Sequence, residues 1–347
     1  MKNFWDSLPR PFFVLAPLAN VTDAAFRRII AKYSKPEGPN VFWTEFVSAD
    51  GLALAHEEGR NKLLRDLLYS EAERPIVAQF FTATPEHMEH AAALAQELGF
   101  DGIDINMGCP DKTIEKQGAG AKLILNPERA VELIAAAKRG APNLPISVKT
   151  RLGYNKDILE EWLPKLLAAE PAALTLHART RKEMSLVPAH WERVKRAVEI
   201  RNELGSKTLI IGNGDALDVA DARKKATESG ADGVMLGRAI FGKPWLFSSV
   251  ESAQEKVLGS PVSRRPLWGA LAGQTIFPDA FRLQIAVEHT KLFEELLGDI
   301  KNFAIMKKHF KAYVEGFDGA KELRMQLMEA KNAAEVESLI ESFLASR

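Results

Sequence analysis

The 347-residue sequence contains a single cysteine, so no disulfide can form within the chain. Disulfides are typical of secreted proteins, and their exclusion favours a reducing compartment. No run of apolar residues approaches the ~20 that a helix needs to cross a bilayer. The apolar stretch at 11–19 is short and runs straight into a helical pattern, which indicates a buried strand rather than a signal peptide. We therefore expect a cytoplasmic protein without a membrane partner.

The chain also lacks an excess of charge of either sign, because 46 Lys and Arg balance 46 Asp and Glu. Such a chain has no overall field that attracts nucleic acid, so a nucleic-acid partner has to bind a local patch of positive charge. His, Asp and Glu nowhere show the spacing of metal ligands, and we expect no metal.

Eight short apolar runs are present, and amphipathic stretches separate most of them. Runs that are apolar on both faces are typical of parallel strands covered by helices. This alternation predicts a (β/α)8 TIM barrel. The alternative is a doubly wound open sheet, which favours a glycine-rich turn after the first strand, and the chain has none there. The runs lie at 12–18, 41–47, 75–81, 102–107, 145–150, 173–178, 208–213 and 233–238.

The pattern changes after residue 247. A stretch rich in Gly and Pro follows, and the remainder is helical in pattern, with three or four helices. We predict a catalytic barrel at 1–250, a linker at 251–280 and a small all-helical domain at 281–347.

Polar residues follow nearly every apolar run, at the strand ends where barrel enzymes carry their catalytic groups. The glycines of "IGNGD" and "LGR", with Arg238, are suited to a phosphate bound between strands seven and eight. Lys149 and His177 would suit a flavin, whose reduced ring carries negative charge, while Gln79 and Asn106 can bond to ring edges. Each feature alone has a structural explanation: glycine turns, a solvated rim lysine or a core histidine.

Seven segments at the predicted strand ends together resemble the tRNA-dihydrouridine synthases. The resemblance covers roughly residues 12–247, and the helical tail with "MKKHF" also looks like that family's C-terminal domain. It implies FMN in the barrel mouth, NADPH as reductant and uridine in tRNA as substrate. The segments are "APLANVTDAAFRRI", "TEFVSADGL", "DINMGCP", "VKTRLG", "LHARTR", "IGNGD" and "MLGRAIFGKPWLF".

The resemblance also assigns residues to the cofactor. Leu18 replaces a methionine usual in the family, which should matter little where bulk and backbone suffice. Residues 183–189, "EMSLVPA", differ from a segment that in relatives more often carries aromatic or glycine residues, and this loop is a candidate RNA contact. The implied FMN contacts are Ala16, Pro17, Leu18, Gln79, Lys149 and His177, with Asn213, Gly214, Asp215, Gly237 and Arg238 at the phosphate.

The lone Cys109 corresponds to the family's catalytic acid. Reduction of uracil to dihydrouracil adds a hydride to C6 and a proton to C5. An ordinary thiol has a pKa of about 8.5, so at pH 7 it is protonated and can donate. The alternative is a small buried side chain with no chemical role.

A folded RNA has to present its uridine extruded from the stack, and cations have to hold its backbone. Lys307, Lys308 and Lys311 lie near one face of a predicted helix, and Asn106, Lys112 and Arg179 lie near the predicted mouth. Two other classes remain open: a dihydroorotate-type flavin enzyme for small molecules, and a non-catalytic RNA-binding module. We expect a monomer that binds tRNA.

Overall fold

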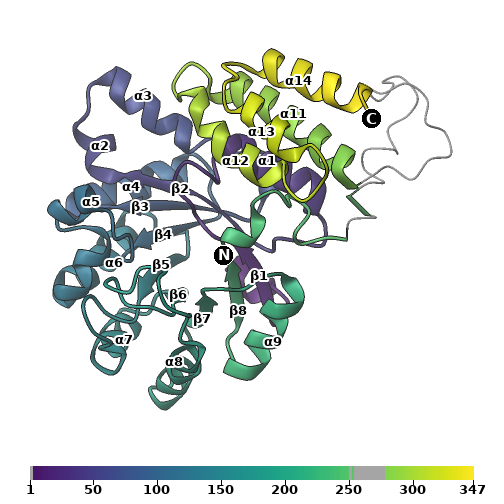
Figure 1. Ribbon diagram of the computed structural model, residues 1–347. Helices are drawn as coiled ribbons and strands as arrows, with labels where there is room; N and C mark the ends of the chain where they lie inside the picture. The colour runs from purple at the N-terminus through teal and green to yellow at the C-terminus, as the bar shows by residue number, and fades with distance from the viewer. Residues whose placement is uncertain (1–2, 250–251, 254–277) are drawn as a thin grey trace. The chain divides into compact units, whose positions relative to one another are not determined.

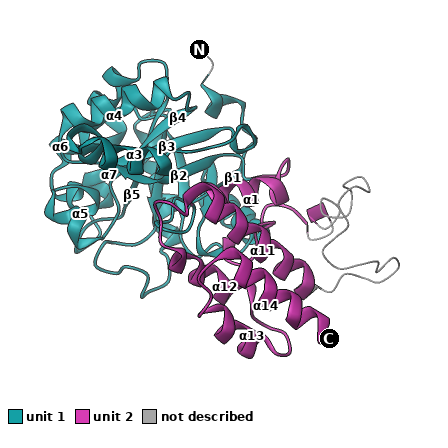
Figure 2. Ribbon diagram, turned by 90° about the horizontal axis from the view of Figure 1, so that it is seen from above, with its two compact units in different colours: residues 1–22, 39–239 teal, residues 23–38, 240–347 magenta. Residues whose placement is uncertain are grey.

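The computed structural model describes residues 3–249, 252–253 and 278–347. These residues form two compact units (Figure 2). The first unit consists of residues 1–22 and 39–239, and the second of residues 23–38 and 240–347. Most of the predicted linker, residues 254–277, lies outside the described residues. No described helix has both the length and the apolar character that crossing a membrane requires.

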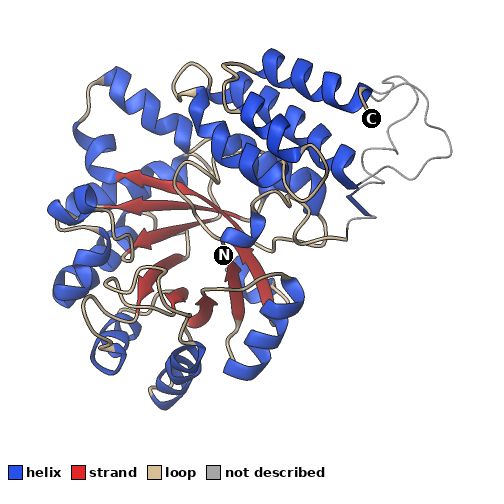
Figure 3. Cartoon of the chain, viewed as in Figure 1, coloured by secondary structure: helices blue, strands red, loops and turns tan. Residues whose placement is uncertain are grey.

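The first unit is a parallel eight-stranded sheet in the order β1-β8-β7-β6-β5-β4-β3-β2. All eight predicted strands are present, and the strands and their helices alternate along the chain (Figure 3). This confirms the predicted TIM barrel, followed by a helical region. The strands are β1 Phe12–Leu15, β2 Phe42–Ser48, β3 Ile76–Phe81, β4 Gly102–Asn106, β5 Ile146–Arg151, β6 Ala173–His177, β7 Leu209–Asn213 and β8 Gly233–Leu236.

Hydrogen bonds between β1 and the start of β2 close the sheet on itself. The Asn40 N–H donates to the Phe13 carbonyl at 2.8 Å, and the Leu15 N–H donates to the Val41 carbonyl at 3.3 Å. Inside, Trp5, Trp43 and other buried apolar side chains pack together in one cluster. Small barrels are filled by side chains in this way, so a ligand has room only at an open end.

Helices cover the outside of the barrel (Figure 1). Their starts follow local signals, since Pro85 begins α4 and the Asn126 side chain caps α6 by accepting from the Arg129 N–H at 3.1 Å. The helices of this unit are α2 Ala49–Leu54, α3 Glu57–Asp66, α4 Pro85–Glu97, α5 Lys112–Lys116, α6 Pro127–Gly140, α7 Leu159–Ala168, α8 Trp191–Glu203 and α9 Val219–Ser229; 3₁₀ turns are η1 Phe4–Ser7, η2 Glu71–Glu73, η3 Gly120–Leu125 and, at the boundary, η4 Arg238–Ile240.

The second unit is helical, with a core of aromatic and histidine side chains. In it α1 packs against α11, and both Lys32 and Tyr33 bond to Glu288. Four helices follow residue 277. The second unit also contains α1, a segment that the sequence pattern placed with the barrel. The helices are α1 Ala24–Ser34, α11 Pro278–Leu297, α12 Lys307–Tyr313, α13 Ala320–Leu327 and α14 Ala333–Ala345, with η5 Phe303–Met306 before α12.

Candidate active site

A cavity of about 740 Å³ opens at the carboxyl ends of the barrel strands. Fourteen of the residues proposed from the sequence line it together, although they come from seven strand ends. They are Ala16, Pro17, Leu18, Gln79, Asn106, Cys109, Lys149, His177, Arg179, Asn213, Gly214, Asp215, Gly237 and Arg238.

The strand register explains why these residues meet. Asn106 pairs with Lys149 across β4 and β5, and His177 pairs with Asn213 across β6 and β7. Side chains at alternate positions of a strand point to the same face, so residues at matching heights form a ring inside the barrel. The ring of polar residues begins where the apolar filling of the barrel ends.

One end of the cavity is suited to a phosphate. Among the described residues, no acceptor bonds to the main-chain N–H of Gly214, Asp215 or Gly237. Gly214 has φ +132° and Asp215 has φ 51°, so the turn after β7 is tightly curled. Arg238 donates to the Asp215 carboxylate at 2.9 Å. Free N–H groups beside an arginine form a site for an anion.

Two arginines neutralise Asp215 at this end. The Arg179 guanidinium bonds to the same carboxylate, and this bond is the main cause of the lowered pKa of Asp215. Arg179 is 2% exposed and also donates to the Val187 carbonyl at 2.6 Å. The pair of arginines around one acid leaves this end of the cavity positively charged.

The middle of the cavity holds a cation and a hydrogen-bond donor. Burial, then the charge of Arg151, lowers the pKa of Lys149 to about 8, and no described residue bonds to its ammonium. Arg179 lies 3.2 Å from His177 Nε2. Because a guanidinium only donates, that nitrogen is an acceptor, and the imidazole proton lies on Nδ1. Burial, followed by the surrounding cations, lowers the pKa of His177 well below its usual value, so the ring is neutral.

Cys109 lies on a loop that the barrel holds in shape. The Asn106 side-chain oxygen accepts from the N–H groups of Gly108, at 3.1 Å, and Cys109, at 2.9 Å. Gly120 packs so close that a Cβ there would lie 2.7 Å from the Cys109 carbonyl. Burial raises the pKa of the Cys109 thiol. The cavity therefore presents a protonated thiol at neutral pH.

Asp104 and Arg151 also hold the site in shape, and the sequence analysis did not identify either of them. Asp104 is fully buried, accepting from Ser147 Oγ and Gln79 Nε2, each at 2.6 Å. Arg151 lines the cavity and donates to the Gly108 carbonyl at 2.7 Å. The sequence did contain a signal for each residue. Asp104 is an acid inside the apolar run at 102–107, and Arg151 is a second cation two positions after Lys149.

The other sequence-proposed residues lie elsewhere. Lys112 is exposed at the start of α5, three residues beyond Cys109. On α12, Lys308 and Lys311 are exposed and Lys307 is half-buried, so this helix presents positive charge to solvent. Contacts of these lysines and of the buried Arg179 with a substrate stay predictions.

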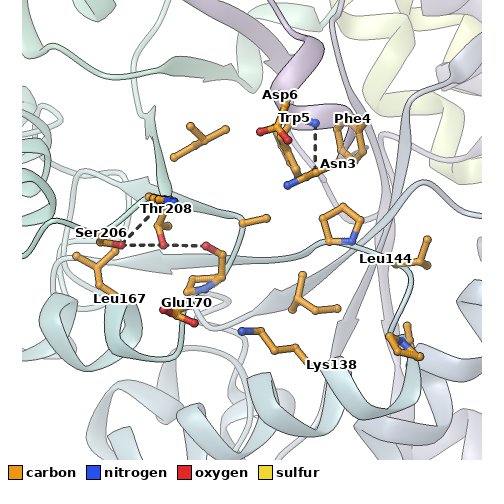
Figure 4. Close-up of a pocket in the computed structure, with 18 of the residues that line it drawn as sticks. Asn3, Phe4, Trp5, Asp6, Lys138, Leu144, Leu167, Glu170, Ser206 and Thr208 are labelled. Atoms are coloured by element: carbon orange, nitrogen blue, oxygen red, sulfur yellow. Dashed lines mark hydrogen bonds between the residues drawn. The ribbon is translucent and has the colours of Figure 1, made fainter. Parts of the chain in front are cut away.

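A larger cavity of about 1350 Å³ lies at the amino ends of the strands. Several polar groups of its lining bond to one another or to nearby main chain (Figure 4). Ser206 Oγ donates to Thr208 Oγ1, the Thr208 hydroxyl donates to the Pro171 carbonyl, and the Trp5 main-chain N–H donates to the Asn3 side-chain oxygen. In barrel enzymes this end serves stability rather than chemistry. The smaller cavity, with its free donors and perturbed pKa values, is the candidate active site.

A TIM barrel with a positively charged cavity and a protonated thiol at the carboxyl ends of its strands has the form of a barrel enzyme. The sequence profile described as "Dihydrouridine synthase (Dus)" matches residues 14–346, and the chain belongs to this family.

Relatives of known family are similar to this chain over nearly its whole length. A probable tRNA-dihydrouridine synthase of Staphylococcus aureus (strain COL) is 40% identical over 346 residues, covering 99% of this chain and 96% of the relative. A probable tRNA-dihydrouridine synthase 2 of Bacillus subtilis (strain 168) is 39% identical over 343 residues, covering 99% and 97%. The family and these relatives identify the chain as an enzyme.

Solved structures show the same fold at low identity. A 2-naphthoyl-CoA reductase complex with 2-naphthoyl-CoA has a TM-score of 0.50 and 13% identity, covering 72% of this chain and 50% of that one. Histamine dehydrogenase from Rhizobium sp. 4-9 also has a TM-score of 0.50 and 13% identity, covering 72% and 46%. These similarities support the barrel architecture alone.

Proposed function

We propose that this enzyme reduces the C5–C6 double bond of uridines in tRNA to give dihydrouridine, with FMN as cofactor, NADPH as reductant and Cys109 as proton donor. The observation that carries the proposal is the Cys109 thiol, in a chain of the dihydrouridine synthase family, in a cavity that is suited to an anion at one end and has the Lys149 ammonium in the middle.

The cavity fits FMN by the chemistry of its donors. The free N–H groups of Gly214, Asp215 and Gly237, with Arg238, would hold the phosphate. Lys149 would stabilise negative charge on the ring, and the Nδ1–H of His177 would donate to a ring acceptor. Held by these residues, FMN would be the source of the hydride that C6 of the base gains.

Cys109 would then complete the reaction. Its thiol donates a proton to C5, which balances the hydride added at C6. The raised pKa of Cys109 keeps that proton available at neutral pH, where a thiolate could not donate. Phe46 lines the same cavity as Cys109 and packs against the same buried cluster, and its ring offers an apolar surface for an extruded base.

The tRNA body would be held by charge outside the cavity. Lys308 and Lys311 on α12 and Lys112 on α5 are exposed cations that can contact phosphates without reading sequence. A cytoplasmic location is part of this proposal, since tRNA is the substrate. A monomeric state is also part of it, since all of the residues that line the cavity come from one chain.

The test uses purified protein with FMN, NADPH and transcribed, unmodified tRNA. We expect dihydrouridine, detected by mass spectrometry as a gain of two hydrogens in a uridine-containing fragment. NADH in place of NADPH tests the reductant. Protein that binds FMN and reduces a free pyrimidine such as orotate, but leaves tRNA unchanged, would support the small-molecule alternative instead.

A further inference from the structure

Buried polar side chains form a continuous chain from the barrel interior to the cysteine loop. Ser147 Oγ donates to Asp104 Oδ1, and Gln79 Nε2 donates to Asp104 Oδ2. Asn106 Nδ2 donates to Gln79 Oε1 at 3.2 Å, and Asn106 Oδ1 accepts from the N–H groups of the loop. Gln79 and Asp104 are both fully buried, so water does not substitute for these bonds.

Asp104 determines which group donates and which accepts in each of these hydrogen bonds. An amide side chain can be turned either way round, but an ionised carboxylate only accepts hydrogen bonds. Gln79 therefore has to present its NH₂ group to Asp104, which leaves its oxygen facing Asn106. Asn106 in turn has to present its NH₂ group to Gln79, which leaves its oxygen facing the N–H groups of Gly108 and Cys109.

We propose that Asp104 is a positioning residue, whose carboxylate orients the amides of Gln79 and Asn106 and so fixes the loop that carries Cys109. Asp104 does not line the cavity and touches no reacting group. The consequence for catalysis rests on the proposed function, but the effect on the loop does not.

The first test is hydrogen exchange of the 106–110 segment, measured by mass spectrometry on protein free of cofactor. In Asp104→Asn, either amide orientation becomes possible, and we expect exchange at Gly108 and Cys109 to rise about fivefold or more, the effect of one lost hydrogen bond. Iodoacetamide alkylation, which reports Cys109 alone because it is the only cysteine, should change as well. The control is Ser147→Ala, which removes a donor to Asp104 but leaves the direction of the chain intact, and should leave both rates unchanged.

A second variant reverses the donor and acceptor roles along this series of hydrogen bonds. In Asp104→Asn combined with Asn106→Asp, the amide at 104 can donate to the Gln79 oxygen. Gln79 can then donate to the new carboxylate at 106, which still accepts from the loop. We expect exchange within about twofold of the original protein, which no simple loss of packing would produce. A double variant that exchanges as fast as Asp104→Asn would overturn the proposal.

Gln79→Met provides the check if Asp104→Asn does not fold, since it removes both central hydrogen bonds at similar volume. Unchanged exchange in Gln79→Met would also overturn the proposal. All these measurements need no FMN, NADPH or tRNA, so they stand whether or not dihydrouridine is formed. In the loaded enzyme, Asp104→Asn should slow the step with tRNA and spare the step with NADPH.

Discussion

Arg238→Ala tests the proposed anion site most cleanly, because this arginine would contact the phosphate and its exposed side chain contributes little to the fold. Its side chain is 65% exposed, and within the described part of the chain it forms an ion pair with Asp215 alone. An exposed pair contributes about 0–1 kcal/mol to stability, so thermal unfolding should hardly change. Asp215 keeps its bond to the buried Arg179, so the turn after β7 should hold.

The loss in affinity should be much larger. A hydrogen bond to a charged group contributes about 1.5–3 kcal/mol, which corresponds to a Kd raised about 10- to 150-fold. The assay is a fluorescence titration of cofactor-free protein with FMN, at low and high salt. Lys224→Ala is the matched control, since Lys224 is exposed and pairs with Glu228 on α9, away from the cavity lining. An FMN affinity equal in Arg238→Ala and Lys224→Ala would refute the phosphate site.

Three other predictions concern charge. Reversing Lys308 and Lys311 should raise KM for tRNA and reduce its salt dependence but leave NADPH oxidation unchanged; steady-state kinetics at several salt concentrations measures this. Because the pKa of Lys149 is about 8, its charge is lost as pH rises through that value, and FMN binding should weaken there in the original protein but not in Lys149→Met. Burial lowers the pKa of His309 to about 3 and also lowers that of His289, so only the unfolded chain takes up these protons below pH ~6.5. As the pH falls below this value, the free energy of unfolding should decrease by up to about 1.4 kcal/mol per pH unit for each histidine. Denaturant unfolding at several pH values should show that the free energy of unfolding of His309→Phe depends less steeply on pH.

The sequence predicted the barrel well because its signals are local. A short apolar run marks a strand wherever it occurs, and Asn126 marks a helix start through a bond to its own helix. The same local view placed α1 with the barrel. Its partner Glu288 lies more than 250 positions away, and no periodic pattern encodes such a contact.

The candidate site was likewise predicted only where the signal in the sequence is local. Polar residues after apolar runs predicted the residues that line the cavity, because strand ends of a barrel meet at one place. The sequence did not show that Arg179 is buried against Asp215, since an exposed and a buried arginine look alike in a loop. Nor did it show the role of Asp104, which depends on bonds to Gln79 and Ser147 from neighbouring strands.

The central claim is that Cys109 donates the proton in a reaction on tRNA. The most direct measurement is the single-turnover reoxidation of photoreduced, FMN-loaded enzyme by unmodified tRNA, without oxygen. In Cys109→Ala, FMN content and reduction by NADPH should be unchanged, while reoxidation should slow about 10²–10⁴-fold, the usual cost of losing a positioned acid. Cys109→Ser should also be slow, because an alcohol is a weaker acid than a thiol. Reoxidation of Cys109→Ala at the original rate would contradict the account and leave the thiol with a packing role only.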